Sequence, residues 1–218
     1  MKFGNYDKLA KYYRKYRPSY NQKILEKIFN NFKKKKLSIV DIGAGTGIFT
    51  KILTKIKKVD KIYAIEPGLH MRREGKYFLK HKKVKWKKGS AEKIFLKNKS
   101  IDVITSASSF HWYDKKKCLK EFARILKKDG YLILAWNPRI TKLSTPEKTI
   151  EKMLKGKYNI KNRISSGKKI NKKSLKRIFY NSPFKLINSY QSIDKKIILK
   201  KNNFFFQNFF NIENFKIY

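Results

Sequence analysis

The chain has 218 residues, with 56 Lys and Arg against 15 Asp and Glu, which gives a formal net charge of +41 at pH 7. This length suits one domain, and 41% hydrophobic residues supply a packed core, which excludes a wholly disordered polycation. The single cysteine, Cys118, excludes an internal disulfide, and three scattered histidines exclude the usual zinc-site spacing. No segment has the apolar length of a secretory leader or a membrane span, so we expect a cytoplasmic protein without a membrane partner.

The positive charge comes almost entirely from lysine, because only eight of the 56 basic residues are arginine. A dedicated nucleic-acid site favours arginine, whose planar fork contacts phosphates and bases through two bonds. The lysines run through nearly every segment beside Asn, Ile, Phe and Tyr, the amino acids of A/T-rich codons. A coding bias therefore explains the composition better than a nucleic-acid surface does, although nucleic acid stays open as a partner.

The predicted elements alternate between helix and strand along the chain. Apolar residues at helical spacing predict helices, in chain order, over residues 7–16, 21–33, 48–56 and 114–127. Short apolar, β-branched runs predict buried strands over residues 37–42, 61–65, 84–88, 101–105 and 131–136. This alternation predicts an α/β fold with a Rossmann-like, doubly wound and mostly parallel sheet.

Beyond residue 137 the regularity is weaker. Helical spacing predicts helices over 145–154 and 172–179, and residues 184–199 alternate weakly, as a strand or hairpin does. Residues 202–218 hold seven Phe and Tyr among asparagines. We interpret this segment as a helix-like tail without a clear strand.

The most informative segment is the glycine turn after the first predicted strand, Asp41-Ile42-Gly43-Ala44-Gly45-Thr46-Gly47-Ile48. Ligands bind outside the carboxyl ends of such strands, where glycine lets the backbone approach them closely. The dinucleotide fingerprint G-x-G-x-x-G would need glycine at position 48, where isoleucine stands. The spacing is instead G-x-G-x-G, with Asp41 two places before the first glycine.

This pattern resembles motif I of the class I S-adenosylmethionine-dependent methyltransferases, and later segments agree with it in order and spacing. Glu66, 21 residues after Gly45, ends the second predicted strand, and Gly89-Ser90-Ala91-Glu92 follows the third. Ile101 to Ile104 match the fourth strand, and Arg124 to Gly130 match the R-x-L-x-x-x-G entry to the fifth. The resemblance covers residues 37–137.

More narrowly, the chain resembles the methyltransferase-11 type, in the branch of trans-aconitate-type small-molecule enzymes. The stretches that carry this resemblance are Tyr6-Asp7, Arg17-Pro18-Ser19-Tyr20, Ile65-Glu66-Pro67, Met71-Arg72, Ser109 to Asp114 and Ala135-Trp136-Asn137. The resemblance implies S-adenosylmethionine as cofactor and a small-molecule methyl acceptor. An RNA or DNA methyltransferase, and a truncated cofactor-binding relative without activity, remain as alternatives.

The resemblance also implies how one domain of residues 1–218 is organised: a helical lid segment over 1–36, a cofactor-binding core over 37–137, and C-terminal helices and strand over 138–218. Family members usually finish with an antiparallel strand pair that completes a seven-stranded sheet. Because residues 202–218 look helix-like, we expect the C-terminal strands to be incomplete. Such an ending would leave a sheet edge or an aromatic patch uncovered.

The resemblance implies a role for several cofactor-binding residues. Asp41 would face the methionyl ammonium group, Glu66 would accept hydrogen bonds from both ribose hydroxyls, and Ala91 would pass its backbone under the adenine. The full expected set is Asp41, Gly43, Ala44, Gly45, Gly47, Glu66, Pro67, Ser90, Ala91, Glu92 and Ser106. No metal is implied.

For the acceptor side we expect Tyr13, Arg17, Tyr20, His111 and Trp112. His111 is the candidate general base, since imidazole titrates near neutrality. The alternative is that His111 and Trp112 form a packed pocket wall, and with a carboxylate acceptor His111 would only orient it. Cys118 occupies a core position of its helix, so we expect it to be structural.

Overall fold

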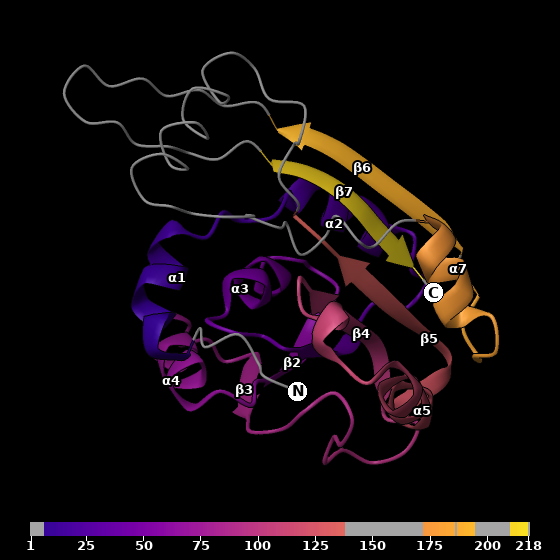
Figure 1. Cartoon of the computed structure of the whole chain (residues 1–218), viewed down its shortest axis with the longest axis horizontal. Helices are drawn as coiled ribbons and strands as arrows, with labels where there is room; N and C mark the ends of the chain where they lie inside the picture. Colours follow the sequence, from indigo (N-terminus) through magenta and orange to yellow (C-terminus); the bar gives the residue numbers. More distant parts are fainter. Residues whose placement is uncertain (1–6, 138–171, 186, 195–209, 218) are drawn as a thin grey trace, which may run out of the picture.

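The computed structural model describes residues 7–137, 172–185, 187–194 and 210–217. Within them one seven-stranded sheet runs in the order β3-β2-β1-β4-β5-β7-β6 (Figure 1). The strands are β1 (Leu37–Ile42), β2 (Val59–Ile65), β3 (Val84–Lys87), β4 (Ile101–Ala107), β5 (Leu126–Ala135), β6 (Asn188–Asp194) and β7 (Phe210–Ile217). The helices are η1 (Asp7–Leu9), α1 (Ala10–Tyr16), α2 (Gln22–Asn30), α3 (Ile48–Thr54), α4 (Leu69–Phe78), η2 (Phe110–Trp112), α5 (Lys115–Ile125) and α7 (Lys172–Phe179).

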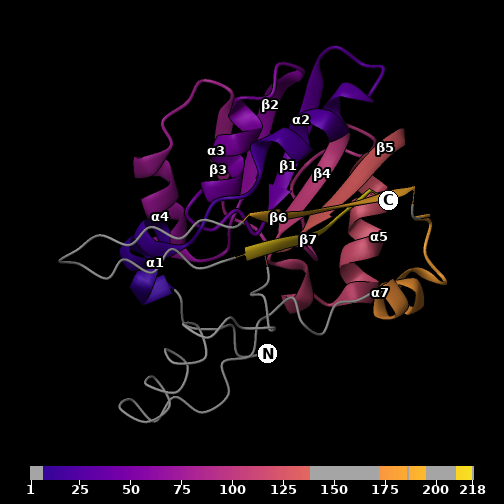
Figure 2. The ribbon, with the colours of Figure 1, turned by 90° about the horizontal axis from the view of Figure 1, so that it is seen from above.

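Helices cover both faces of the sheet because neighbouring strand residues point to opposite sides. Ile39 of β1 is buried against α2 and α3, whereas Val40 packs in the cluster that contains α5 and α7. Val103 and Ile104 of β4 divide between the two clusters in the same way. Figure 2 shows α2 and α3 on one side of the sheet and α5 on the other. The predicted doubly wound α/β fold is therefore confirmed.

The first five strands are parallel, and β7 is antiparallel to both β5 and β6. The expected helix-like tail is wrong over residues 210–217, which form β7 and complete the antiparallel pair. Pairing with β6 skips Asn214, since Phe215 faces Tyr190 and Glu213 faces Gln191. This bulge interrupts the alternation of the segment, and an interrupted alternation is harder to recognise in sequence.

Other predicted elements differ from the structure at their ends. The predicted helix over 114–127 ends at Ile125, because the amides of Lys99 and Ser100 donate to the carbonyls of Arg124 and Ile125 and draw Leu126 into the sheet. The helix over 172–179 is confirmed. The helix expected over 145–154, and residues 195–199 and 202–209, lie outside the described residues.

α7 packs onto the main body through aromatic rings. The ring of Phe179 stacks on that of Phe110 in η2, with centroids 6.0 Å apart and planes 7° from parallel. Phe110 in turn lies edge-on to Trp136, just after β5, at 6.4 Å. These rings connect α7 to the loop that follows β4. In the described part of the chain, no helix is long and apolar enough to cross a lipid bilayer.

Candidate active site

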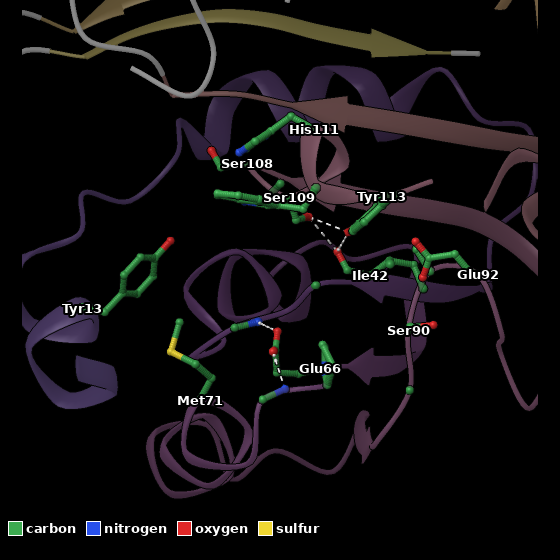
Figure 3. Close-up of a pocket in the computed structure, with 18 of the residues that line it drawn as sticks. Tyr13, Ile42, Glu66, Met71, Ser90, Glu92, Ser108, Ser109, His111 and Tyr113 are labelled. Atoms are coloured by element: carbon green, nitrogen blue, oxygen red, sulfur yellow. Dashed lines mark hydrogen bonds between the residues drawn. The ribbon is translucent and has the colours of Figure 1, made fainter. Parts of the chain in front are cut away.

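A cavity of about 450 Å³ opens at the carboxyl ends of the central parallel strands (Figure 3). Its volume lies in the usual range of small-molecule sites, about 300 to 1,000 Å³. α1 and the turn after it contribute Tyr13 and Arg17, and α4 contributes Met71. The other lining residues end or follow β1, β2, β3 and β4: Ile42, Gly43, Gly45, Glu66, Pro67, Gly68, Gly89, Ser90, Ala91, Glu92, Ala107, Ser108, Ser109, His111, Trp112 and Tyr113.

The glycine turn forms one wall of the cavity, and its backbone is left-handed at Gly43 (φ 66°) and Gly45 (φ 57°). A Cβ at Gly43 would lie 2.6 Å from Cβ of Ser109, so internal packing alone requires glycine there. A Cβ at Gly45 would meet nothing closer than Cε of Met71, at 3.7 Å. Gly45 thus leaves open space, and its backbone is accessible from the cavity.

Glu66 joins the glycine turn to the turn after β2. Its Oε2 accepts a hydrogen bond from the amide of Gly45 at 2.8 Å, and its Oε1 accepts one from the amide of Gly68 at 2.9 Å. Arg72 donates to the backbone carbonyls of Glu66, at 2.7 Å, and Pro67, at 3.1 Å. Each carboxylate oxygen has more than one acceptor position, so these contacts are compatible with ligand hydroxyls as additional donors.

Asp41 is not among the residues that line the cavity, and its expected contact with the methionyl ammonium group stays a prediction. Its carboxylate is buried and accepts hydrogen bonds from the hydroxyls of Thr50, at 2.6 Å, and Thr105, at 2.9 Å. Asp41 and Thr105 are register partners on parallel strands, so their side chains share one face of the sheet. Burial raises the pKa of Asp41 to about 6. The carboxylate therefore supports the strand and α3 beneath the turn.

A hydroxyl network forms the floor of the cavity. Ser109 donates to the carbonyl of Ile42 at 3.0 Å, and the Tyr113 hydroxyl lies 3.0 Å from the same oxygen. Ser106 lies below them, with its oxygen 2.8 Å from that of Ser109. Ser106 is fully buried, and its expected contact with a ligand stays a prediction. Burial also raises the pKa of Tyr113, which keeps its hydroxyl protonated.

A second group of polar side chains lies across the cavity from Glu66 and Met71, as Figure 3 shows for Ser108 and His111. The hydroxyl of Ser108 accepts hydrogen bonds from the Tyr20 hydroxyl, at 2.8 Å, and from Nη2 of Arg17, at 3.2 Å. Tyr20 is buried behind Ser108 and does not itself line the cavity. Burial raises the pKa of Tyr20 to about 12.

His111 lies in the cavity wall beside Trp112, with ring centroids 4.9 Å apart. Both ring nitrogens are buried and have no hydrogen-bond partner among the residues that the structure describes. Burial, together with the positive charges of Lys115 and Arg17, lowers the pKa of His111 to about 4. The imidazole is therefore neutral at pH 7 and a weak base.

The structure brings most of the expected site residues together and leaves some outside the cavity. Those that line it are Tyr13, Arg17, Gly43, Gly45, Glu66, Pro67, Ser90, Ala91, Glu92, His111 and Trp112. Those that do not are Asp41, Ala44, Gly47, Tyr20 and Ser106. Sequence reasoning assigned no role to Met71, Ser109 and Tyr113, although the stretches that carry the resemblance contain all of them, and Ser108 carried no signal at all.

Cys118 is fully buried in α5, in agreement with a structural role, and burial raises the pKa of its thiol to about 12. Within the described residues, no cluster of three or more His, Cys, Asp or Glu side chains could hold a metal ion.

Comparison with known proteins agrees with this geometry. Residues 40–134 match the family model described as a methyltransferase domain. An uncharacterised methyltransferase-like protein of Schizosaccharomyces pombe is 34% identical over 145 residues, which are 65% of this chain and 54% of that protein. The ubiquinone/menaquinone biosynthesis C-methyltransferase UbiE of Campylobacter jejuni is 30% identical over 122 residues, 53% of this chain and 51% of that protein. The chain spans about half the length of the curated relatives it matches.

Solved structures share the fold. The crystal structure of an S-adenosylmethionine-dependent methyltransferase from Aquifex aeolicus superposes with a TM-score of 0.63 at 19% identity, over 99% of each chain. At this identity the likeness concerns the fold alone. The family match, the sheet order and the glycine turn with its acidic partner agree with one another. All three agree with the methyltransferase domain that residues 40–134 match.

Proposed function

We propose that the chain catalyses methyl transfer from S-adenosylmethionine to a small-molecule acceptor, and that residues 1–218 act as one domain. The observation that carries the proposal is the open side of Gly45, whose amide is held by Glu66 at 2.8 Å on the cavity wall. Because no protein atom crowds Gly45, the amino-acid part of the cofactor could approach its backbone closely. The neighbouring carboxylate of Glu66 could accept hydrogen bonds from the two ribose hydroxyls.

The lining residues fit this cofactor. The turn at Gly43 and Gly45 would hold its amino-acid end, Glu66 its ribose, and Ser90 and Ala91 its adenine. Asp41 would act indirectly, by supporting the turn through Thr50 and Thr105. Once bound, S-adenosylmethionine supplies a methyl group that its sulfonium has already activated. The protein's remaining task is to align the acceptor with that group and to exclude water.

The state of His111 favours one of the two roles open to it. A neutral imidazole whose pKa is about 4 has little tendency to take a proton from an alcohol or amine. We therefore assign His111 and Trp112 to the wall that orients the acceptor. The narrower proposal, the trans-aconitate-type branch, is supported by the stretches from Arg17 and from Ser109 that line the cavity. That one relative is named a ubiquinone/menaquinone biosynthesis C-methyltransferase also supports a small-molecule acceptor.

Titration calorimetry with S-adenosylhomocysteine tests the cofactor site. Glu66→Gln keeps the shape and removes the charge, so we expect its affinity to fall at least about tenfold, as losing charge-assisted hydrogen bonds implies. Glu26→Gln, which removes a carboxylate from α2 away from the cavity, is the matched control and keeps the affinity within about twofold. Equal affinities in both variants would reject the placement of the site.

Incubation with small metabolites and labelled cofactor tests the reaction itself. Formation of S-adenosylhomocysteine together with one metabolite that gains a methyl group supports a small-molecule acceptor. Cofactor binding without any turnover supports the inactive relative.

The net charge of +41 motivates the nucleic-acid alternative. An RNA methyltransferase would methylate added RNA, and its RNA affinity would fall steeply with salt concentration, because true phosphate contacts release counterions. RNA that binds without gaining methyl groups would reflect the lysine-rich surface alone.

A further inference from the structure

We infer that the hydroxyl of Ser108, aimed by Tyr20 and Arg17, is a hydrogen-bond donor for a carboxylate group that anchors the methyl acceptor. This inference rests on the proposed function of the cavity and names the chemical class of its second ligand. The inference names the group through which the acceptor binds and does not specify the atom that receives the methyl group.

The orientation of the Ser108 hydroxyl follows from its two partners. A serine hydroxyl has one hydrogen to donate and two positions at which it accepts. Tyr20 donates to it at 2.8 Å and Arg17 donates to it at 3.2 Å, which occupies both accepting positions. Among the described residues no acceptor receives the remaining hydrogen, and Ser108 lines the cavity. The hydrogen is therefore available to a ligand.

The backbone holds Ser108 firmly in this place. Its φ is 50°, a left-handed conformation that costs a residue with a Cβ about 1 to 2 kcal/mol. The amide of Ser108 donates to the carbonyl of Ala135 at 2.8 Å, which ties the residue to the end of β5. A strained conformation fixed by a neighbouring strand is typical of residues that contact ligands.

The charged groups are unevenly distributed around the cavity. The carboxylates of Glu66 and Glu92 line the side at the ends of β2 and β3. The charged group in contact with Ser108 is cationic, because Arg17 donates to its hydroxyl. The charges of Arg17 and Lys115 both act on the neighbouring His111, and Lys115 also interacts with Glu92 and Asp114. A donor hydroxyl beside a guanidinium suits a negatively charged oxygen group, and two donors match the two oxygens of a carboxylate.

The test uses acetate, the carboxylate probe, and acetamide, its uncharged counterpart of nearly the same shape. Each is titrated into the full chain loaded with S-adenosylhomocysteine in physiological salt, and the indole N–H signal of Trp112, which lines the cavity, is followed by NMR. The variants are Ser108→Ala and Tyr20→Phe. The matched control is Ser100→Ala, which removes a serine hydroxyl at the other end of β4.

We expect acetate to shift the Trp112 signal and acetamide to bind about tenfold more weakly or not at all. Ser108→Ala should weaken acetate binding about tenfold, the loss expected for one hydrogen bond to a charged group. Tyr20→Phe should reduce the preference for acetate over acetamide. If Tyr20 had only a structural role, the substitution would leave that preference unchanged. Ser100→Ala should behave as the unchanged chain does.

Three results would overturn the inference: acetate affinity unchanged in Ser108→Ala, equal binding of acetate and acetamide, or no shift of the Trp112 signal. A fourth would reassign the subsite to the carboxylate of the cofactor: acetate that binds only without S-adenosylhomocysteine, together with weaker S-adenosylhomocysteine binding in Ser108→Ala. Failure of the proposed function is a different observation: the unchanged chain would then not bind S-adenosylhomocysteine, or it would bind the cofactor without methylating any metabolite.

Discussion

Replacing single glycines of the turn by alanine separates its packing from its binding role. Gly43 and Gly45 share a left-handed backbone, so alanine costs about 1 to 2 kcal/mol of strain at either position. At Gly43 the new Cβ would also lie 2.6 Å from Cβ of Ser109 and 2.8 Å from the hydroxyl of Tyr113. Overpacking of this kind costs about 1 to 3 kcal/mol more. At Gly45 the nearest atom is 3.7 Å away, so no overpacking is expected.

The summed cost for Gly43→Ala is about 2 to 5 kcal/mol. For a domain of this length, each kcal/mol lowers Tm by about 2 to 4 °C, so Tm should fall by about 4 to 20 °C. Gly45→Ala should lower Tm by only about 2 to 8 °C on the same scale. Its Cβ would instead occupy cavity space, so its main effect should be weaker binding of S-adenosylhomocysteine.

Thermal unfolding followed by circular dichroism, together with titration calorimetry, measures both effects on the same preparations. The expected pattern is a large loss of stability in Gly43→Ala and a selective loss of affinity in Gly45→Ala. Equal Tm values for the two variants, or full affinity in Gly45→Ala, would refute the division of roles between these glycines.

Other variants probe the buried acids and the attachment of α1. Because burial raises the pKa of Asp41 from 3.8 to about 6, this carboxyl makes folding more favourable in acid, and that contribution is lost as pH rises through 6. Asp41→Asn should therefore remove a stability difference of about 3 kcal/mol between pH 4 and pH 7, as measured by urea unfolding at both. Burial alone would raise the pKa of Asp102, but hydrogen bonds from Lys34 and Lys127 outweigh it and lower that pKa, so its contribution is present above pH 4 and lost in acid. Asp102→Asn should cost about 1 to 3 kcal/mol at pH 7 and reduce sensitivity to acid in the same unfolding experiment. Arg14→Ala leaves the buried carboxylate of Glu74 without its ion pair, so hydrogen exchange should become faster in α1 than in α5; equal protection in both helices would contradict this.

Local patterns were sufficient to predict the parallel core and the ligand end of the sheet. A β-branched run such as Leu37 to Ile42 forms a strand in almost any α/β context, and the glycines after it require a tight turn. Glu66 was predictable because its distance along the chain from Gly45 follows from one βαβ unit. The parallel strands, the glycine turn and the position of Glu66 therefore follow from patterns between residues that are close in sequence.

Other features depend on partners distant in sequence. The Asp41 carboxylate is bound by the hydroxyls of Thr50 and Thr105, and its register with Thr105 on the neighbouring strand is set by the sheet, which no local pattern shows. Ser108 gains its orientation from Tyr20, 88 residues earlier in the chain. β7 was missed because its apolar residues alternate at 210 and 212 and again at 215 and 217, and the change of phase falls at the bulged Asn214.

The stacking of Phe179 on Phe110 connects α7 to the part of the cavity wall that η2 forms. Phe110 begins η2, and the next residues of that short helix, His111 and Trp112, line the cavity. A smaller or larger ring in α7 would tilt η2 and reshape the wall, while the cofactor side would stay as it is. Evolution can thus change which molecule is accepted by substituting residues that never meet it.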